Sequence, residues 1–411
     1  MISGKKSKII RDNKNMLTIK IIFWSLIFIV FYAYLGYGIV LYLIVRVKRV
    51  FVKQSEEATS NTELPEVTLF IAAYNEKDFV ETKLENSYNL DYPKDKLKIM
   101  WVTDGSDDGT PDLLRKYDDI IVLHEPARNG KISAMNRGFQ YVTSPIVVFS
   151  DANTLLGKQS IREIVRLFNK PRVGCVSGEK RIFKKEKDSA AGAGEGIYWK
   201  YESKLKQWDA ELYSVVGAAG ELFAVRTELF QPVEPDTLLD DFIISLRIAM
   251  NGHTIQYSPQ AYAMETSSSN VKEEMKRKVR IAAGGIQSVI RLYPLLNIFK
   301  YGVLSFQYIS HRVLRWTLAP ISLPLIFILN LILIINTGLF SLSLYAILFW
   351  CQIVFYTSAL TGWYLENKQL RVKVLFIPYY FFIMNLSIYL GLKRYITKQQ
   401  SVNWERAKRG T

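Results

Sequence analysis

The sequence predicts an α/β domain with a mixed, mostly parallel sheet, inserted between membrane-spanning helices. Three observations support this architecture. Long uncharged apolar stretches lie near the N-terminus and in the C-terminal part of the chain. Between them, strand-like and helix-like segments alternate, as in βαβ units. Acidic and amide side chains follow several of the expected strands, at the edge where such sheets bind ligands.

The apolar stretches are residues 21–45, 316–365 and 374–392, and none of them contains a charge. Because a helix needs about 20 apolar residues to cross a bilayer, they predict one, two and one spans. We therefore expect one N-terminal helix within 1–50 and about three helices within 317–392.

The first apolar stretch is expected to be a retained anchor. It is too long for a signal peptide and no small-residue cleavage site follows it. Arg46, Lys48 and Arg49 come next, which indicates a cytoplasmic flank. A soluble block over 51–298 would then face the cytoplasm, in a multi-pass protein of the plasma membrane. The sidedness of the two basic tails, the last being 393–411, stays open, because their charge and the parity of the spans conflict.

Composition excludes several kinds of protein. The net charge is +15, but the basic residues are spread along the chain, and we expect no nucleic-acid partner. Cys175 and Cys351 stand alone, so no disulfide framework is indicated. The three histidines show no zinc spacing.

The soluble block begins with three repeats of strand, polar turn and helix. A β-branched run over 66–76 precedes a helical pattern over 79–90, and a second strand is expected within 97–110. Pro111 opens the next helix. Further strands are expected within 119–126 and 145–154. This rhythm is typical of a parallel sheet.

Polar residues end three of these strands: Asn75 and Glu76, then Asp104, then Asp151. A single acidic turn is weak evidence, because Asp and Asn are ordinary turn residues. Three of them at one sheet edge predict a crevice that can bind a base, a ribose and a cation.

The motifs AAYNE, DGSDDGT, RNGKISAMN, SDAN, GAAGELFAVR and LLDDFIISLR follow one another in this order. Over about residues 65 to 285, the chain resembles the family 2 glycosyltransferases with a GT-A fold. It is similar to their membrane-embedded branch, which includes hyaluronan, chitin, cellulose and poly-N-acetylglucosamine synthases.

This resemblance implies a site for a nucleotide sugar. Its expected residues are Ala73, Tyr74, Glu76, Asp104, Lys131, Asp151, Arg277 and Arg280. Asp104 would contact the base, and Lys131 would reach the nucleotide or its phosphates, as a lysine on a flexible stem can. The two arginines would grip the diphosphate. Ile281 stands where polymer synthases of this family carry a tryptophan.

Asp151 and Asn153 match the metal motif of the family. Oxygen ligands of this kind suit Mg²⁺ or Mn²⁺. An amide in the second position brings no charge, so we expect weaker cation binding and more dependence on the phosphates of the substrate. The alternative is that Asn153 only caps a turn.

Asp241, with Asp240 as its neighbour, takes the position of the catalytic base in the resemblance. Adjacent carboxylates raise each other's pKa and favour proton transfer. Helix capping is the alternative role. The acceptor side would be Gly217, Ala218, Gly220 and Glu221, with Trp199 as a sugar-stacking face.

The segment 299–316 ends in HRVLRW, and we interpret it as an amphipathic interface helix. Arg312 and Arg315 would snorkel toward the membrane surface.

These features predict an inverting, metal-dependent transferase that moves a sugar from UDP to a growing polysaccharide, such as a capsule or exopolysaccharide. The protein would export the chain through its own spans. One alternative is a non-processive enzyme acting on a lipid or lipid-linked acceptor. A more remote alternative is a non-catalytic scaffold or a transporter, which the lack of paired charges within the spans disfavours.

Overall fold

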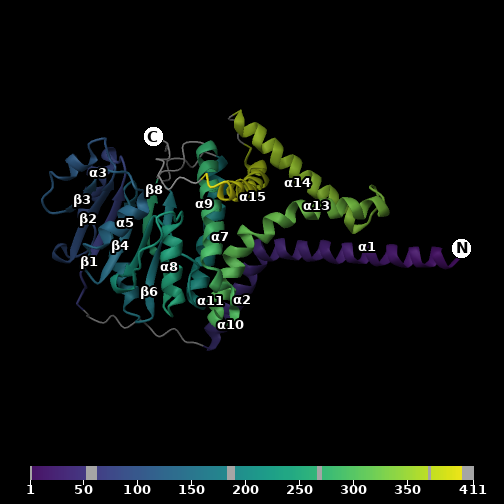
Figure 1. Cartoon of the computed structure of the whole chain (residues 1–411), viewed down its shortest axis with the longest axis horizontal. Coiled ribbons are helices and arrows are strands. Elements are labelled where there is room, and N and C mark those ends of the chain that lie inside the picture. The colour runs from purple at the N-terminus through teal and green to yellow at the C-terminus, as the bar shows by residue number, and fades with distance from the viewer. Residues whose placement is uncertain (1, 52–62, 183–189, 266–270, 369–371, 400–411) are drawn as a thin grey trace.

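The protein is described from a computed structural model, shown in Figure 1. The described residues are 2–51, 63–182, 190–265, 271–368 and 372–399.

Among the described residues, an eight-stranded sheet forms the centre of the domain between the apolar helices, with strand order β3-β2-β1-β4-β7-β6-β8-β5. β1, β2, β3 and β4 are parallel neighbours, whereas β7 runs antiparallel to both β4 and β6. The strands are β1 Val67–Ala73, β2 Leu97–Asp104, β3 Ile121–Glu125, β4 Ile146–Asp151, β5 Leu155–Leu156, β6 Val173–Ile182, β7 Leu222–Arg226 and β8 Thr254–Glu265. The sheet is therefore mixed, as the sequence predicts.

Both faces of this sheet are covered, so the central strand β1 is buried along its whole length. Phe70 and Met100 face one hydrophobic core with α5 (Lys131–Phe139) and α8 (Asp240–Met250). Leu69 and Trp101 face the other core, which contains side chains of α3 (Lys77–Tyr88), α4 (Thr110–Leu114) and α6 (Ser160–Phe168). This double burial explains why the strands read as nearly continuous apolar runs.

A second set of helices lies between the sheet domain and the projecting apolar helices (Figure 1). Its long members are α7 (Ala190–Leu212) and α9 (Val271–Arg291). Shorter pieces follow α9: η5 Tyr293–Leu296, α10 Ile298–Tyr301, α11 Val303–Tyr308, the π-helix η6 Ile309–Val313 and α12 Leu314–Trp316. Within the segment expected as an interface helix, α11, η6 and α12 follow one another without a break, so residues 303–316 form one helix that contains a π-turn.

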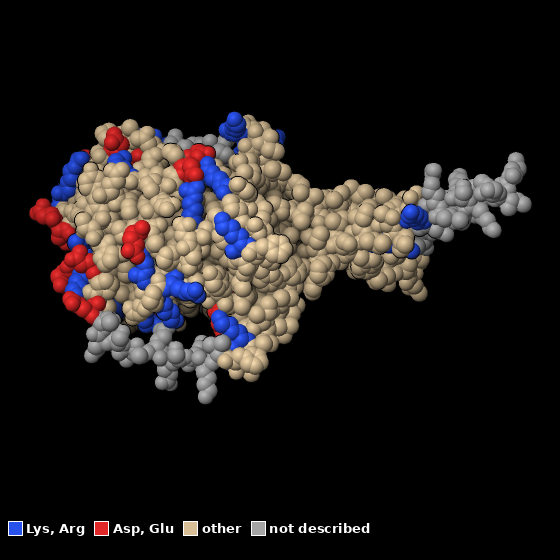
Figure 2. Space-filling view, turned by 60° about the horizontal axis from the view of Figure 1, so that its bottom comes forward, with Lys and Arg blue, Asp and Glu red and all other residues tan. Residues whose placement is uncertain are grey.

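In the described part of the chain, four helices are long and apolar enough to cross a membrane, one near the N-terminus and three near the C-terminus, as the sequence predicts. The first consists of α1 (Ile2–Phe31), the π-turn η1 (Tyr32–Gly36) and α2 (Tyr37–Phe51). The others are α13 (Leu318–Thr337), α14 (Leu344–Asn367) and α15 (Lys373–Ile396). Figure 2 shows charged side chains over the rounded domain, while the projecting part carries almost none until Lys and Arg appear near its far end. This distribution indicates a membrane protein.

Candidate functional site

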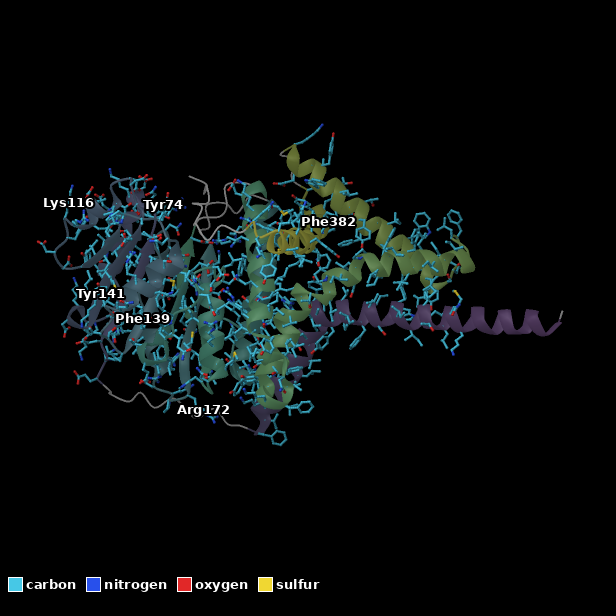
Figure 3. All side chains as sticks on the ribbon, in the orientation of Figure 1. Tyr74, Lys116, Phe139, Tyr141, Arg172 and Phe382 are labelled. Atoms are coloured by element: carbon cyan, nitrogen blue, oxygen red, sulfur yellow. The ribbon has the colours of Figure 1, made fainter. Side chains whose placement is uncertain are left out.

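The polar strand ends that the sequence singles out meet at one edge of the sheet. β1 pairs in parallel with β2 and with β4, so that Ala73 lies beside Thr103 and Ala72 beside Asp151. In Figure 3, Tyr74, which follows β1, lies near the upper edge of the domain, whereas Tyr141, which precedes β4, lies lower. The carboxyl ends of these strands therefore share the upper edge.

The turn after β1 is tied to the turn after β2. Asn75 adopts a left-handed backbone with φ 53°, which is uncommon outside glycine. Its side chain donates to Asp107 Oδ1 at 2.8 Å and accepts from the Asp107 amide at 3.0 Å. The Glu76 amide donates to Thr110 Oγ1 at 3.1 Å. These hydrogen bonds hold the two turns together next to Tyr74. The centre of the Tyr74 ring lies 3.8 Å from the guanidinium carbon of Arg128.

Asp104 is buried at the end of β2 and binds the backbone of the loop between β3 and α5. Its Oδ2 accepts hydrogen bonds from the amides of Asn129 (2.9 Å) and Gly130 (2.6 Å). Burial raises the pKa of Asp104, although these two hydrogen bonds oppose the shift. Its Oδ1 is buried and has no hydrogen-bond partner among the described residues, although Arg137 Nη1 lies 3.9 Å away. One oxygen thus shapes the loop that leads to Lys131, and the other can accept from a ligand.

Lys131, the first residue of α5, links the two acidic groups of the site. Its ammonium lies 3.1 Å from Asp151 Oδ1 and 3.4 Å from Asp240 Oδ2. Burial alone would lower the pKa of Lys131, but the charges of Asp151, Asp240 and Asp241 outweigh it and raise the pKa. Lys131 is therefore a permanent positive charge between the end of β4 and the start of α8.

Asp151 and Asn153 can supply two oxygen ligands to a cation. Asn153 Oδ1 is buried and has no hydrogen-bond partner within the described part of the chain. Asn153 therefore does not cap the turn after β4 in which it lies. No group of three His, Cys, Asp or Glu side chains that could hold a metal occurs among the residues described. The pair fits Mg²⁺ or Mn²⁺ bound mainly through substrate phosphates, because such ions often take only one or two protein ligands.

Asp240 and Asp241 occupy the first two positions of α8, where the helix dipole favours negative charge. The N-cap is Leu239, whose side chain makes no capping hydrogen bond, so capping alone does not explain the two acids. Burial, followed by repulsion from Asp240, raises the pKa of Asp241 to about 7, although Lys131 opposes the shift. A carboxyl in this range can accept a proton near neutral pH.

The predicted acceptor segment lies against α8, and its small residues have different neighbours. A Cβ on Gly220 would lie 3.3 Å from Asp241 Oδ2, which places this glycine beside the expected base. Gly217 has φ +84°, and a Cβ there would meet the Phe242 ring at 2.1 Å. The Ala218 amide donates to Ser245 Oγ at 3.0 Å. Packing against α8 therefore accounts for Gly217 and Ala218.

A buried ion cluster adjoins this segment. Lys180 lies 2.7 Å from Glu221 and also pairs with Glu265. Its ammonium lies 5.5 Å from the centre of the Trp199 ring. Burial would raise the pKa of Glu221, but the charge and hydrogen bond of Lys180 outweigh it and hold the pKa below its usual range. Glu221 and Trp199 are thus brought together by a lysine that the sequence did not single out.

The two arginines of α9 are placed differently from each other. Arg277 donates two hydrogen bonds of 2.9 Å to Glu274, one turn earlier on the same helix. Its charge acts on Lys180 and Glu221, so it belongs to the acceptor-side cluster. Arg280 is exposed. The structure therefore brings Arg277 close to Lys180 and Glu221, whereas the side chain of Arg280 faces solvent.

The expectation that Arg312 and Arg315 of HRVLRW snorkel toward the membrane surface is wrong. Arg312 lies 2.6 Å and Arg315 3.3 Å from the buried carboxylate of Glu202 on α7. His311 is fully buried between Asp209 (2.6 Å) and Glu202 (3.2 Å). The reason is that α7 presents two buried acids, and a buried charge needs a partner. Their spacing of seven residues, which puts both on one helix face, was the available signal.

The segment that pairs with Glu202 also contacts the first apolar helix and the start of α8. Arg315 Nε donates to the Ala33 carbonyl in η1 at 2.8 Å. Trp316 packs against Phe242 with ring centroids 5.2 Å apart, and a Cβ on Gly285 would come within 2.6 Å of its ring. The structure thus brings a tryptophan to the start of α8, from a segment other than the α9 motif.

We expect Glu202→Gln to destabilise the protein by about 3–5 kcal/mol, because it leaves buried cations without their carboxylate. Thermal unfolding in detergent measures the effect. Glu211→Gln on the same helix is the control: Glu211 pairs with Arg49 at the surface, and we expect a loss of about 1 kcal/mol or less. Equal losses in the two variants would contradict a buried ionic joint.

Comparison with known proteins agrees with this fold. Residues 65–284, more than half of the chain, match the family model described as "Glycosyltransferase like family 2". A Bacillus subtilis protein named "Probable glycosyltransferase YdaM" is 25% identical over 378 residues, covering 84% of this chain and 87% of that protein. A Staphylococcus aureus poly-β-1,6-N-acetyl-D-glucosamine synthase is 27% identical over 241 residues, and the match spans only 57% of the synthase.

Among solved structures, a mannosyltransferase from Pyrobaculum calidifontis superposes with a TM-score of 0.67 and 24% identity, over 93% of this chain and 100% of that one. This likeness concerns the fold. Together with the family match it shows that the chain belongs to the family 2 glycosyltransferases and is an enzyme with a GT-A-like domain, related to polysaccharide synthases.

Proposed function

We propose that the protein transfers a sugar, with inversion, from a UDP-sugar to a growing polysaccharide at the cytoplasmic face of the plasma membrane. The observation that supports this most is the Lys131 bridge, which joins Asp151 on the donor side to Asp240 beside the expected base. A single displacement needs a leaving-group site and a base close together, and the proximity of Asp151 and Asp240 through Lys131 supports this assignment.

In this proposal, Asp104 Oδ1 and the turn after β1 bind the nucleoside. The ammonium of Lys131, which lies beside Asp151 and Asp240 in the free protein, binds the diphosphate of the donor. Asp241 accepts the proton of the acceptor hydroxyl as its oxygen attacks the anomeric carbon, and the nucleotide leaves with the bonding electrons. A Mg²⁺ or Mn²⁺ ion held by Asp151 and Asn153 would neutralise charge on the diphosphate. Gly220 leaves space beside Asp241 for the acceptor sugar.

The direct test is nucleotide release by purified protein with a panel of nucleotide sugars, followed by sizing of the product. The Pyrobaculum enzyme was solved with GDP-mannose and Mn²⁺, so the panel includes GDP-sugars as well as UDP-sugars. Release of UDP with a polymeric product supports the proposal. A product with one added sugar on a lipid would instead support the non-processive alternative, and export would then not be expected.

We expect kcat/KM to fall about tenfold for each pH unit below about pH 7, because the base must be unprotonated to act. The pKa of Asp241 sets this limit, being raised to about 7 by burial and by Asp240. Initial rates at low donor concentration measure the profile, and donor binding over the same pH range is the control. A flat profile down to about pH 5 would contradict Asp241 as the base.

A further inference from the structure

Two side chains of helix α3 form hydrogen bonds with the turn after β4, and no step of the proposed reaction uses them. Lys83 Nζ donates to Ser150 Oγ and to the Thr154 carbonyl, each at 2.7 Å. Asn86, three residues later on the same helix face, donates to the Leu156 carbonyl at 2.9 Å and accepts from the Leu156 amide at 2.8 Å. One face of α3 therefore holds both ends of the segment 150–156.

The burial of Lys83 needs an explanation, because a buried ammonium is costly unless its donors are satisfied. Lys83 is 1% exposed, and the carboxylate whose charge acts on it is Asp151, in the turn that it contacts. Its third neighbour is Thr154 Oγ1 at 3.5 Å, so all three acceptors around its three donors belong to the turn after β4. The placement of Lys83 thus serves this turn.

The same contacts fix the backbone that carries the expected cation ligands. Thr154 Oγ1 donates to the Asp151 carbonyl at 2.9 Å and lies 3.2 Å from Ser150 Oγ. Lys83 therefore holds the residues on both sides of Asp151 and Asn153. Without the hydrogen bonds of Lys83, the turn would be more mobile, since loops are held by few contacts. The side chains of Asp151 and Asn153 would then vary in their positions relative to each other.

We propose that Lys83 is a positioning residue for the diphosphate side of the site, acting through the turn 150–154. This role rests on the proposed function, because it requires a nucleoside diphosphate donor. It differs from a general role in core packing in one measurable respect. Loss of the hydrogen bonds of Lys83 should weaken recognition of the phosphates and leave the nucleoside pocket, formed at the ends of β1 and β2, intact.

The test compares the binding of UDP and of uridine to the full-length protein in detergent with Mg²⁺, by titration calorimetry or ligand-detected NMR. Lys83→Met keeps the length of the side chain and removes its donors. We expect UDP binding to weaken about tenfold, as for the loss of hydrogen bonds from a charged group, with uridine binding unchanged. Ser87→Ala is the control, since Ser87 is buried on the same helix and its hydroxyl donates to the Lys83 carbonyl.

A second variant, Ser150→Ala, removes one acceptor of Lys83 and tests the same contact if Lys83→Met does not fold. It should weaken UDP binding in the same direction, by a smaller factor. Equal weakening of UDP and uridine, or no weakening of UDP, would overturn the role of Lys83. If the wild-type protein binds GDP instead, only the proposed donor falls, and GDP and guanosine take the place of UDP and uridine. Wild-type protein that binds no nucleoside diphosphate would overturn both proposals.

Discussion

Asp241→Asn is expected to reduce sugar transfer by about 10³-fold, because an amide cannot accept the proton of the acceptor hydroxyl. The substitution keeps the shape of the side chain beside Gly220 and Phe242. Donor binding should change little, since Lys131 retains Asp151 and Asp240 as partners. Turnover with the preferred nucleotide sugar, measured together with donor affinity, gives the result.

The same substitution should leave the protein as stable as the wild type, or more so. The pKa of Asp241 rises from 3.8 to about 7 on folding. A raised carboxyl pKa makes folding less favourable as the pH rises through this interval, because the native state holds its proton more tightly. Asparagine carries no such cost. A melting temperature that falls together with activity would therefore point to a structural role for Asp241.

The control for this experiment is Asp112→Asn. Asp112 lies in the first turn of another helix, α4, and pairs with Arg115 at the surface. Its loss should change neither turnover nor donor affinity by more than about twofold. Wild-type turnover in Asp241→Asn would show that another group is the base.

Asp151→Ala is expected to reduce turnover at low donor concentration by about 10²-fold, because the turn after β4 loses its only carboxylate and the cation its charged ligand. Lys131 also loses Asp151, which lies nearer to its ammonium than Asp240 does. Activity measured against Mg²⁺ and Mn²⁺ concentration, and after EDTA, tests this. Activity that EDTA does not affect would exclude the assignment of a cation to Asp151.

Asn153→Asp provides the opposite change at the same turn. A second carboxylate should lower the cation concentration needed for half-maximal activity by about tenfold, because affinity for such ions follows the charge of the ligands. The Asn153 oxygen already lies buried without a hydrogen-bond partner among the described residues, so the new carboxylate replaces no existing contact. An unchanged cation requirement would mean that residue 153 faces away from the ion.

Much of the fold follows from local patterns in the sequence. The uncharged stretches predict the four apolar helices because a bilayer imposes their length, and the alternation of strands and helices predicts the parallel half of the sheet. The positions of Asp104 and Asp151 at strand ends predict that they meet, since parallel strands share an edge. The placement of Asp240 and Asp241 at a helix start follows from the apolar stripe behind them.

The tertiary structure alone decides which charged residues are partners. Glu202 meets Arg312 and Arg315, and Lys83 meets Ser150 and Thr154, across long stretches of chain. An arginine beside an apolar segment looks the same in sequence whether it reaches a membrane surface or a buried acid. Hydrophobic periodicity and strand direction are local properties, so they predict the architecture and the meeting of the polar strand ends. Ion pairing depends on distances in space between segments, and only the folded chain defines those distances.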